Sequence, residues 1–266
     1  MSALAAKAGS ETPPRMTYAS RVVWTRRGVI AAIAVFFEIY GRTFADPNLF
    51  SPPSTIVAAL FQKVFAEERI RDAIWITFME VSVAYVMSVV FGLAAGLLVG
   101  WTRPGRHAVY PIILLLYSIP QVILLPLFVL IFGIGPAVKI AFGFTHGIFP
   151  IMVNVIAGMR NVSPLLLSGS RSLGASSIDV ARHVYFPHMV PSLFAGLRLA
   201  MTLTLLGVIL GELYVSTTGI GYYTKLFAER LDPAPLFALI SVLAFMAILL
   251  NEVVRVAERK FTRWKR

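Results

Sequence analysis

The sequence predicts an all-α membrane protein, a polytopic bundle of about six transmembrane helices. Hydrophobic residues make up 58% of the 266 residues, compared with ~45–50% in soluble domains, and charged residues make up 14%, compared with ~25%. The mean hydropathy is +0.78. The apolar residues gather into long runs, and about 20 such residues cross ~30 Å of hydrocarbon. A soluble fold would have too few polar groups for its surface, so these observations together indicate a chain embedded in lipid.

The first two apolar runs differ in how clearly they predict a span. The run over residues 28–44 is the weakest of the six, because Glu38 and Arg42 interrupt its outer half. The run over residues 73–101 contains an uncharged stretch from Val81 to Trp101, which is long enough to cross the membrane. Small residues recur along it at every fourth position and allow close packing against another helix. They are Ala84, Ser88, Gly92, Gly96 and Gly100.

The remaining runs cover residues 108–136, 137–159, 189–215 and 234–254. The first of these contains Pro111, Pro120 and Pro126, which predict a kinked or broken helix. A Gly-Ile-Gly-Pro turn over residues 133–136 separates it from the next run. The connector over residues 46–72 contains Pro52-Pro53, after which Ser54 is the expected N-cap of a short amphipathic helix over 55–65.

The net charge of +11 follows the pattern of a membrane protein. Sixteen of the 24 Lys and Arg residues lie in the tails and in the connectors after the second and fourth runs, and five lie in the opposite connectors. Because basic residues concentrate on the cytoplasmic side, we expect both termini there and the chain in the cytoplasmic (inner) membrane. The expected organisation is a cytoplasmic tail over 1–27, one transmembrane domain over 28–258 and a basic cytoplasmic tail over 259–266. No basic and aromatic stripe indicates a nucleic-acid partner.

The sequence lacks the residues that several kinds of chemistry require. There is no cysteine, which excludes a disulfide scaffold, a thiol nucleophile and a thiolate metal site. The four histidines show no metal-binding spacing with carboxylates, so no metal site is expected. No Gly-x4-Gly-Lys-Ser/Thr stretch is present to bind a nucleotide. We therefore expect neither catalysis nor a cofactor in this chain.

The polar segment over residues 160–190 is too regular for a loose loop. Ser176 or Ser177 can cap a short helix with Asp179 in its first turn, and Pro187 and Pro191 are expected to end it. Apolar residues recur at helical spacing along this helix, at Ile178, Ala181, Val184 and Tyr185. The stripe suits either a partner at the cytoplasmic face or the lipid surface.

The residue types and spacing of this segment resemble the EAA loop of ABC-importer permeases. That pattern reads Glu-Ala-Ala, three residues, Gly, nine residues, Ile, one residue, Leu-Pro. Here the positions are held by Ser168-Gly169-Ser170, Gly174, Val184 and Phe186-Pro187. Ser168 departs from the family's Glu, which removes a carboxylate from the loop. From about Ser51 to Arg266 the chain is similar to the nitrate/sulfonate/taurine branch, in stretches that include 125–127, 132–135, 196–200 and 218–222.

The resemblance implies a type I ABC-importer permease fold and a role as one subunit of a larger transport complex. Two permease chains, expected to be a homodimer, would form the path, and a periplasmic or lipid-anchored binding protein would deliver the solute. A cytoplasmic ATPase dimer, which binds the ATP and Mg, would dock on the coupling residues. These are Ser168, Gly169, Ser170, Gly174, Ile178, Ala181, Val184, Phe186 and Pro187. The implied solute is a sulfonate or taurine, an aromatic acid, or a thiamine-precursor or riboflavin-like heterocycle, with nitrate or another small anion as the alternative.

Ionisable residues within the apolar runs are candidates for the solute path, because charge at membrane depth usually faces a cavity or a partner. They are Glu80, Lys139, Arg198 and Glu212. Mutual pairing or snorkelling to the interface is the rival interpretation. A secondary carrier independent of an ATPase, an intramembrane enzyme and a passive scaffold are the rival functions. The sequence shows no internal repeat that would favour a secondary carrier and no converging catalytic groups that would favour an enzyme. A passive scaffold would leave the EAA spacing unexplained.

Overall fold

The computed structural model describes residues 18–261, and every element within that range is helical. The expected tails over 1–27 and 259–266 therefore lie largely outside the described residues. The helices are α1 (Tyr18–Thr43), α2 (Pro53–Ala59), η1 (Leu60–Val64), α3 (Glu68–Trp101), α4 (Arg103–Ser118), η2 (Gln121–Leu124), α5 (Leu125–Phe132), α6 (Pro136–Arg160), α7 (Pro164–Ser172), α8 (Ser177–Val180), η3 (Ala181–Tyr185), α9 (Phe186–Val215), α10 (Ile220–Glu229) and α11 (Pro233–Phe261).

Four helices of the described chain are long and apolar enough to cross a membrane: α3, α6, the continuous helix Ser177–Val215, and α11. A fifth span results if the pair Pro104–Ser118 and Gln121–Phe132, bent by 79°, crosses as one unit. The bend confirms the kinked or broken helix that the prolines of this run predict. The run over residues 28–44 lies largely in α1, which begins ten residues earlier. Because of its charged residues, α1 is less hydropathic than the four apolar helices and is not counted among them.

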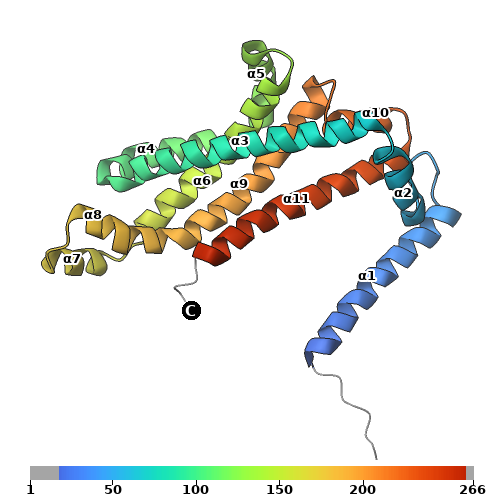
Figure 1. The fold of residues 1–266 in the computed structure, drawn as a ribbon. Coiled ribbons are helices and arrows are strands. Elements are labelled where there is room, and N and C mark those ends of the chain that lie inside the picture. Colours follow the sequence, from blue (N-terminus) through green and yellow to red (C-terminus); the bar gives the residue numbers. More distant parts are fainter. Residues whose placement is uncertain (1–17, 262–266) are drawn as a thin grey trace, which may run out of the picture.

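Helices α3, α6 and α9 form the centre of the bundle, and α11 lies alongside α9 (Figure 1). The predicted stripe of small residues on α3 is buried where α3 crosses α6. A Cβ atom on Gly96 would lie 2.9 Å from Cβ of Val155, and one on Gly92 would lie 3.0 Å from Cβ of Ile151. The stripe therefore serves close helix packing, as its spacing predicts.

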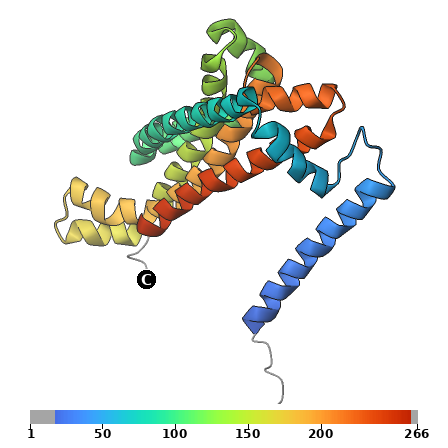
Figure 2. The ribbon, with the colours of Figure 1, turned by 45° about the vertical axis from the view of Figure 1, so that its right-hand side comes forward.

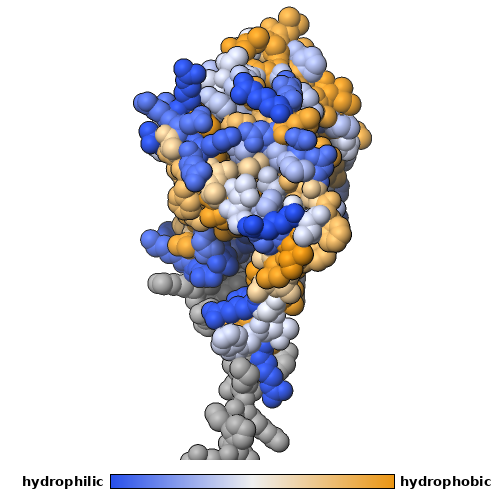
Figure 3. Space-filling model, turned by 90° about the vertical axis from the view of Figure 1, so that its right-hand side faces the viewer, coloured by the Kyte–Doolittle hydropathy of each residue, from blue (hydrophilic) through white to orange (hydrophobic). Residues whose placement is uncertain are grey.

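The two ends of the bundle carry different short elements. One end holds α7 and α8 together with the end of α3, the start of α4 and the end of α11, and the other end holds α2 and α10 (Figure 1). Figure 3 looks onto the end with α2 and α10 and shows hydrophilic side chains gathered there between hydrophobic ones. The long apolar helices thus run between two ends that differ in their short elements.

Helix α1 leaves the bundle and touches mainly α2 (Figures 1 and 2). The Glu38 carboxylate on α1 accepts hydrogen bonds from the backbone N–H and the hydroxyl of Ser54, at 2.9 and 2.7 Å. The prediction of Ser54 as an N-cap is therefore wrong: α2 begins at Pro53, with Pro52 at its N-cap. Proline suits the first turn because no backbone donor is needed there, and this leaves Ser54 free to bond α1.

Candidate functional site

A hairpin of two short helices forms one end of the molecule. Helix α7 is capped by the Ser163 side chain and ends at Ser172, after which Gly174 has φ +79°. This left-handed conformation favours glycine, and it turns the chain so that the N–H of Ala175 donates to the carbonyl of Ser170 at 3.1 Å. The turn between the two helices therefore lies at Gly174, and α7 is an element that the sequence pattern did not indicate.

The second helix of the hairpin begins with a reciprocal cap. The Asp179 N–H donates to Oγ of Ser176 at 3.2 Å, and the Asp179 carboxylate accepts from the Ser176 hydroxyl and backbone N–H at 2.6 and 3.1 Å. These hydrogen bonds favour the ionised form of the Asp179 carboxylate, in the first turn of α8. The predicted cap at Ser176 is confirmed, and the start of α8 is fixed at neutral pH.

The prediction that Pro187 and Pro191 end this helix is wrong. Helix α8 continues through η3 into α9, and both prolines lie within the continuous helix Ser177–Val215. The physical reason is a π-helical turn over Ala181–Tyr185, in which the N–H of Phe186 donates to the carbonyl of Ala181. Pro187 follows this shifted hydrogen bond and lies in the first turn of α9. The backbone N–H that proline lacks is not needed there.

The nine predicted coupling residues all lie in the hairpin or at its junction with α9. Ile178 is exposed to 78%, at the start of α8, and Leu173 at the turn is exposed to 89%. Ser168 and Gly169 are exposed on α7, whereas Ser170, Ala181, Val184 and Pro187 are partly covered; Phe186 is exposed. The hairpin thus presents exposed apolar side chains at its turn, beyond the ends of the long helices (Figure 1).

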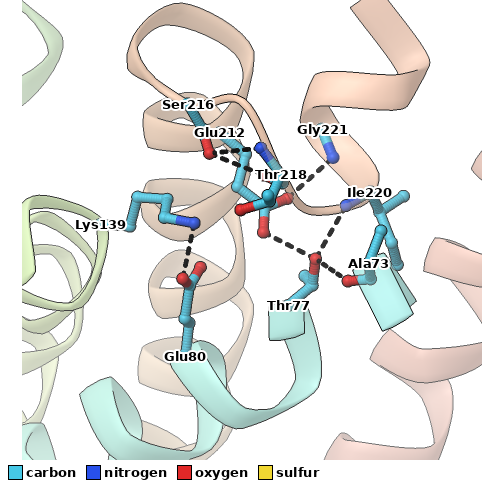
Figure 4. A network of polar contacts seen from close by, with 9 residues as sticks. All are labelled: Ala73, Thr77, Glu80, Lys139, Glu212, Ser216, Thr218, Ile220 and Gly221. Atoms are coloured by element: carbon cyan, nitrogen blue, oxygen red, sulfur yellow. Dashed lines mark hydrogen bonds and ion pairs between the residues drawn. The ribbon is translucent and has the colours of Figure 1, made fainter. Parts of the chain in front are cut away.

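A buried ionic network lies toward the opposite end of the bundle. Lys139 at the start of α6 and Glu80 on α3 point toward each other (Figure 4), with 2.5 Å between Nζ and Oε1. Lys139 is 1% and Glu80 4% exposed. They therefore pair with each other inside the packed bundle, which is the rival interpretation to a role in the solute path.

Glu212, near the end of α9, holds the following loop against α3. Its carboxylate accepts hydrogen bonds from the Thr77 hydroxyl at 2.6 Å and from the N–H of Gly221 at 2.7 Å (Figure 4). The Thr77 hydroxyl also accepts from the N–H of Ile220 at 2.9 Å. Gly219 has φ +102°, and a Cβ atom there would lie 2.0 Å from Oε1 of Glu212. Only glycine fits this approach.

Three of the four predicted path residues thus meet in one region, and the fourth does not. Arg198, nearer the start of α9, forms an ion pair with Glu258 of α11 and remains partly exposed. Thr77 is a member of the network that the sequence does not single out. Its only signal is its place one turn before Glu80 on the same face of α3.

The chain is similar to known membrane transport proteins over most of its length. The family profile described as binding-protein-dependent transport system inner membrane component matches residues 88–264. The formylaminopyrimidine transport permease protein of Halalkalibacterium halodurans is 27% identical over 88% of this chain and 93% of that protein. The taurine transport system permease protein of Escherichia coli is 27% identical over 92% of this chain and 91% of that protein.

Among solved structures, a chain of the MetNI methionine ABC transporter in an inward-facing conformation is similar, with a TM-score of 0.59. It is 21% identical, and the likeness covers 73% of this chain and 95% of that chain. This likeness supports the fold that the sequence predicts.

Proposed function

Since this chain belongs to the family of binding-protein-dependent transport system inner membrane components, we propose that it forms the translocation path of an ATP-driven importer for a small organic solute. The solute is a sulfonate or taurine, an aromatic acid, or a thiamine-precursor or riboflavin-like heterocycle. An extracytoplasmic binding protein delivers it at the end with α2 and α10. An ATPase dimer docks at the end with α7 and α8 and supplies the ATP and Mg chemistry, so that this chain is a transport subunit without catalysis of its own.

The exposed apolar turn of the hairpin is the observation that carries this proposal. Leu173 and Ile178 are exposed to 89% and 78% at the end of the molecule where Arg160, Arg171 and Arg182 also lie. Water is a poor solvent for such side chains, and the basic residues favour the cytoplasm over lipid for this end. A partner with an apolar cleft therefore suits this surface, as the EAA spacing implies.

The hairpin is joined to the opposite end of the bundle by one helix. The helix Ser177–Val215 has 39 residues without a break, which corresponds to roughly 60 Å at ~1.5 Å per residue. It begins at the docking turn and carries Glu212 near its other end. A displacement of the hairpin by the ATPase would thus reach the loop at Gly219–Gly221, as alternating access requires.

The path itself lies between two copies of the chain in this proposal. The crossing of α3, α6 and α9 is filled by close contacts at glycines, such as Gly147 against Ser88 and Thr204. The centre of a single bundle therefore leaves no room for a solute. A second copy facing the first provides the space, and both copies present a hairpin to the ATPase dimer.

Purification of the tagged chain from membranes in mild detergent tests this function. We expect a P-loop ATPase at about one copy per permease, and we expect Ile178→Asp to lose it while Ile178→Val keeps it. Both variants should insert into the membrane at the normal level. Recovery of the chain alone, under conditions that hold a known importer together, would contradict the proposal and favour a secondary carrier.

A further inference from the structure

A large cleft lies at the hairpin end, between the ends of the long helices and α7. Its volume is about 1280 Å³, which exceeds the ~300–1,000 Å³ of common ligand pockets. Trp101 of α3, Arg106 of α4, Arg160 of α6 and Arg171 of α7 are among the lining residues. Two pairs of consecutive helices, from separate parts of the sequence, therefore line one site.

The charge of this cleft is unbalanced. Three arginines and His107 line it, and no Asp or Glu is among the lining residues. The Arg106 guanidinium donates to the carbonyl of Gly100 at 2.8 Å, which fixes its position. Within residues 18–261, Arg160 and Arg171 form no ion pair. Guanidinium groups that line one cleft without a carboxylate attract an anion, and phosphate matches their paired donors best.

The residue at position 168, a serine, accounts for the absence of a negative charge from the cleft. It lines the cleft one helical turn before Arg171, at the position where the EAA pattern has Glu. A carboxylate at this position would lie close enough to Arg171 to pair with it on the face of α7. With Ser in its place, whose hydroxyl donates to the carbonyl of Leu165 at 3.1 Å, the cleft keeps its full positive charge.

The rest of the lining matches a lipid rather than a free ion. Trp101 is the last residue of α3 and Arg160 is the last residue of α6, so the cleft begins where two apolar helices end. Tryptophan at such a boundary is typical of the headgroup level of a membrane. Pro164, Leu165 and Leu167 add apolar surface beside the arginines, as the start of an acyl chain requires.

We propose that this cleft binds an anionic phospholipid of the cytoplasmic leaflet, with its phosphate held by Arg106, Arg160 and Arg171. The inference rests on the proposed function for the side of the membrane on which the hairpin lies. In the proposed function the ATPase also binds at this end of the molecule. It docks on the exposed apolar residues of the hairpin turn, Leu173 and Ile178, which are not among the lining residues of the cleft. The docking turn therefore lies outside the lipid site, with Ser168 the one coupling residue that lines the cleft, and a bound lipid would anchor α7 to the spans.

The test measures lipid retained by the full-length chain, purified with whatever partners accompany it. The protein is equilibrated in mixed micelles of phosphatidylglycerol and phosphatidylcholine, and bound lipid is counted by native mass spectrometry. The variant Arg160→Gln/Arg171→Gln is compared with Arg259→Gln/Lys260→Gln, which removes the same charge from the exposed end of α11. We expect wild type and control to retain phosphatidylglycerol selectively, and the cleft variant to bind it roughly fivefold more weakly for each arginine removed.

Three results would overturn the proposal. The first is equal retention of phosphatidylglycerol by the cleft variant and its control. The second is full displacement of the lipid by millimolar inorganic phosphate, which would indicate a site for a free anion. The third is a cleft variant that keeps its lipid and loses the ATPase, which would make the cleft a protein interface. Because lipid is counted on the chain with or without an ATPase, failure of the proposed function is seen separately, in the pull-down.

Discussion

The ion pair between Lys139 and Glu80 carries the clearest prediction at the scale of single residues. Replacing Lys139 by Met would leave the Glu80 carboxylate buried without its partner, which costs ~3–5 kcal/mol. We expect Lys139→Met to lower the thermal midpoint of the detergent-solubilised protein strongly. The measurement is fluorescence-detected size exclusion after heating.

A surface pair provides the matched control for this substitution. Lys63 pairs with Asp232 at 2.8 Å, but both side chains are substantially exposed. Such pairs contribute ~0–1 kcal/mol, so Lys63→Met should change little. The double variant Lys139→Met/Glu80→Gln should recover part of the loss, because no charge then remains buried. Equal midpoints for Lys139→Met and Lys63→Met would contradict the assignment.

Thr77 supports a second prediction at this scale. Its hydroxyl joins the Glu212 carboxylate and the N–H of Ile220. Thr77→Val keeps the shape and leaves both groups without this partner, which costs ~1–3 kcal/mol, whereas Thr77→Ser keeps the hydroxyl. We expect faster hydrogen exchange at the Ile220 amide in the Val variant and near-normal exchange in the Ser variant. The same exchange rate in both would show that the hydroxyl does not hold the loop.

The sequence marks the charged residues of this network but not their partners. Glu80, Lys139 and Glu212 stand out because charge is rare within apolar runs. Their pairing joins α3, α6 and α9, and no spacing along the chain predicts a contact between three separate helices. Thr77 is a common residue on an apolar helix, so nothing in its own type distinguishes it.

At the scale of elements, the hairpin turn at Gly174 can be tested directly. Its φ is +79°, and no atom would lie within 4 Å of a Cβ atom at this position, so a substitution there strains the backbone without a clash. We expect Gly174→Leu to insert into the membrane normally and to lose the co-purifying ATPase and solute uptake. Gly174→Asn should be milder, because Asn tolerates the left-handed region better.

Membrane fractionation, ATPase recovery and uptake together decide this prediction. Gly28→Leu is the control, since Gly28 lies within α1, outside the coupling segment, and also has open space around it. Normal uptake and normal ATPase binding by Gly174→Leu would show that the segment is not the coupling element.

The elements themselves were predictable to different degrees. The runs over 73–101, 137–159 and 234–254 correspond to α3, α6 and α11, because an uncharged apolar run in lipid has to be helical. The course of residues 181–191 was not predictable, since prolines stop a helix in most sequences. A π-turn, which depends on how the chain packs, allows the helix to pass through Pro187.

At the scale of the whole molecule, the helices divide into a packed bundle and the separate α1. The bundle was predictable in outline from hydropathy, charge and the stripe of small residues on α3. The position of α1 was not, because its apolar residues are exposed around the helix and α2 is its main contact. The composition of α1 indicates that this helix contacts lipid or a partner, but it does not determine the position of the helix relative to the bundle.

The orientation of the whole chain is the last prediction, and the absence of cysteine makes it direct to test. Asn161→Cys introduces an exposed thiol at the hairpin end, and Thr217→Cys introduces one in the exposed loop after α9. Because Arg160, Arg171 and Arg182 gather at the hairpin end, we expect that end in the cytoplasm. A membrane-impermeant maleimide should therefore label Thr217→Cys in intact cells and Asn161→Cys only after permeabilisation. Labelling of Asn161→Cys in intact cells would invert the topology and place the hairpin where no ATPase could reach it.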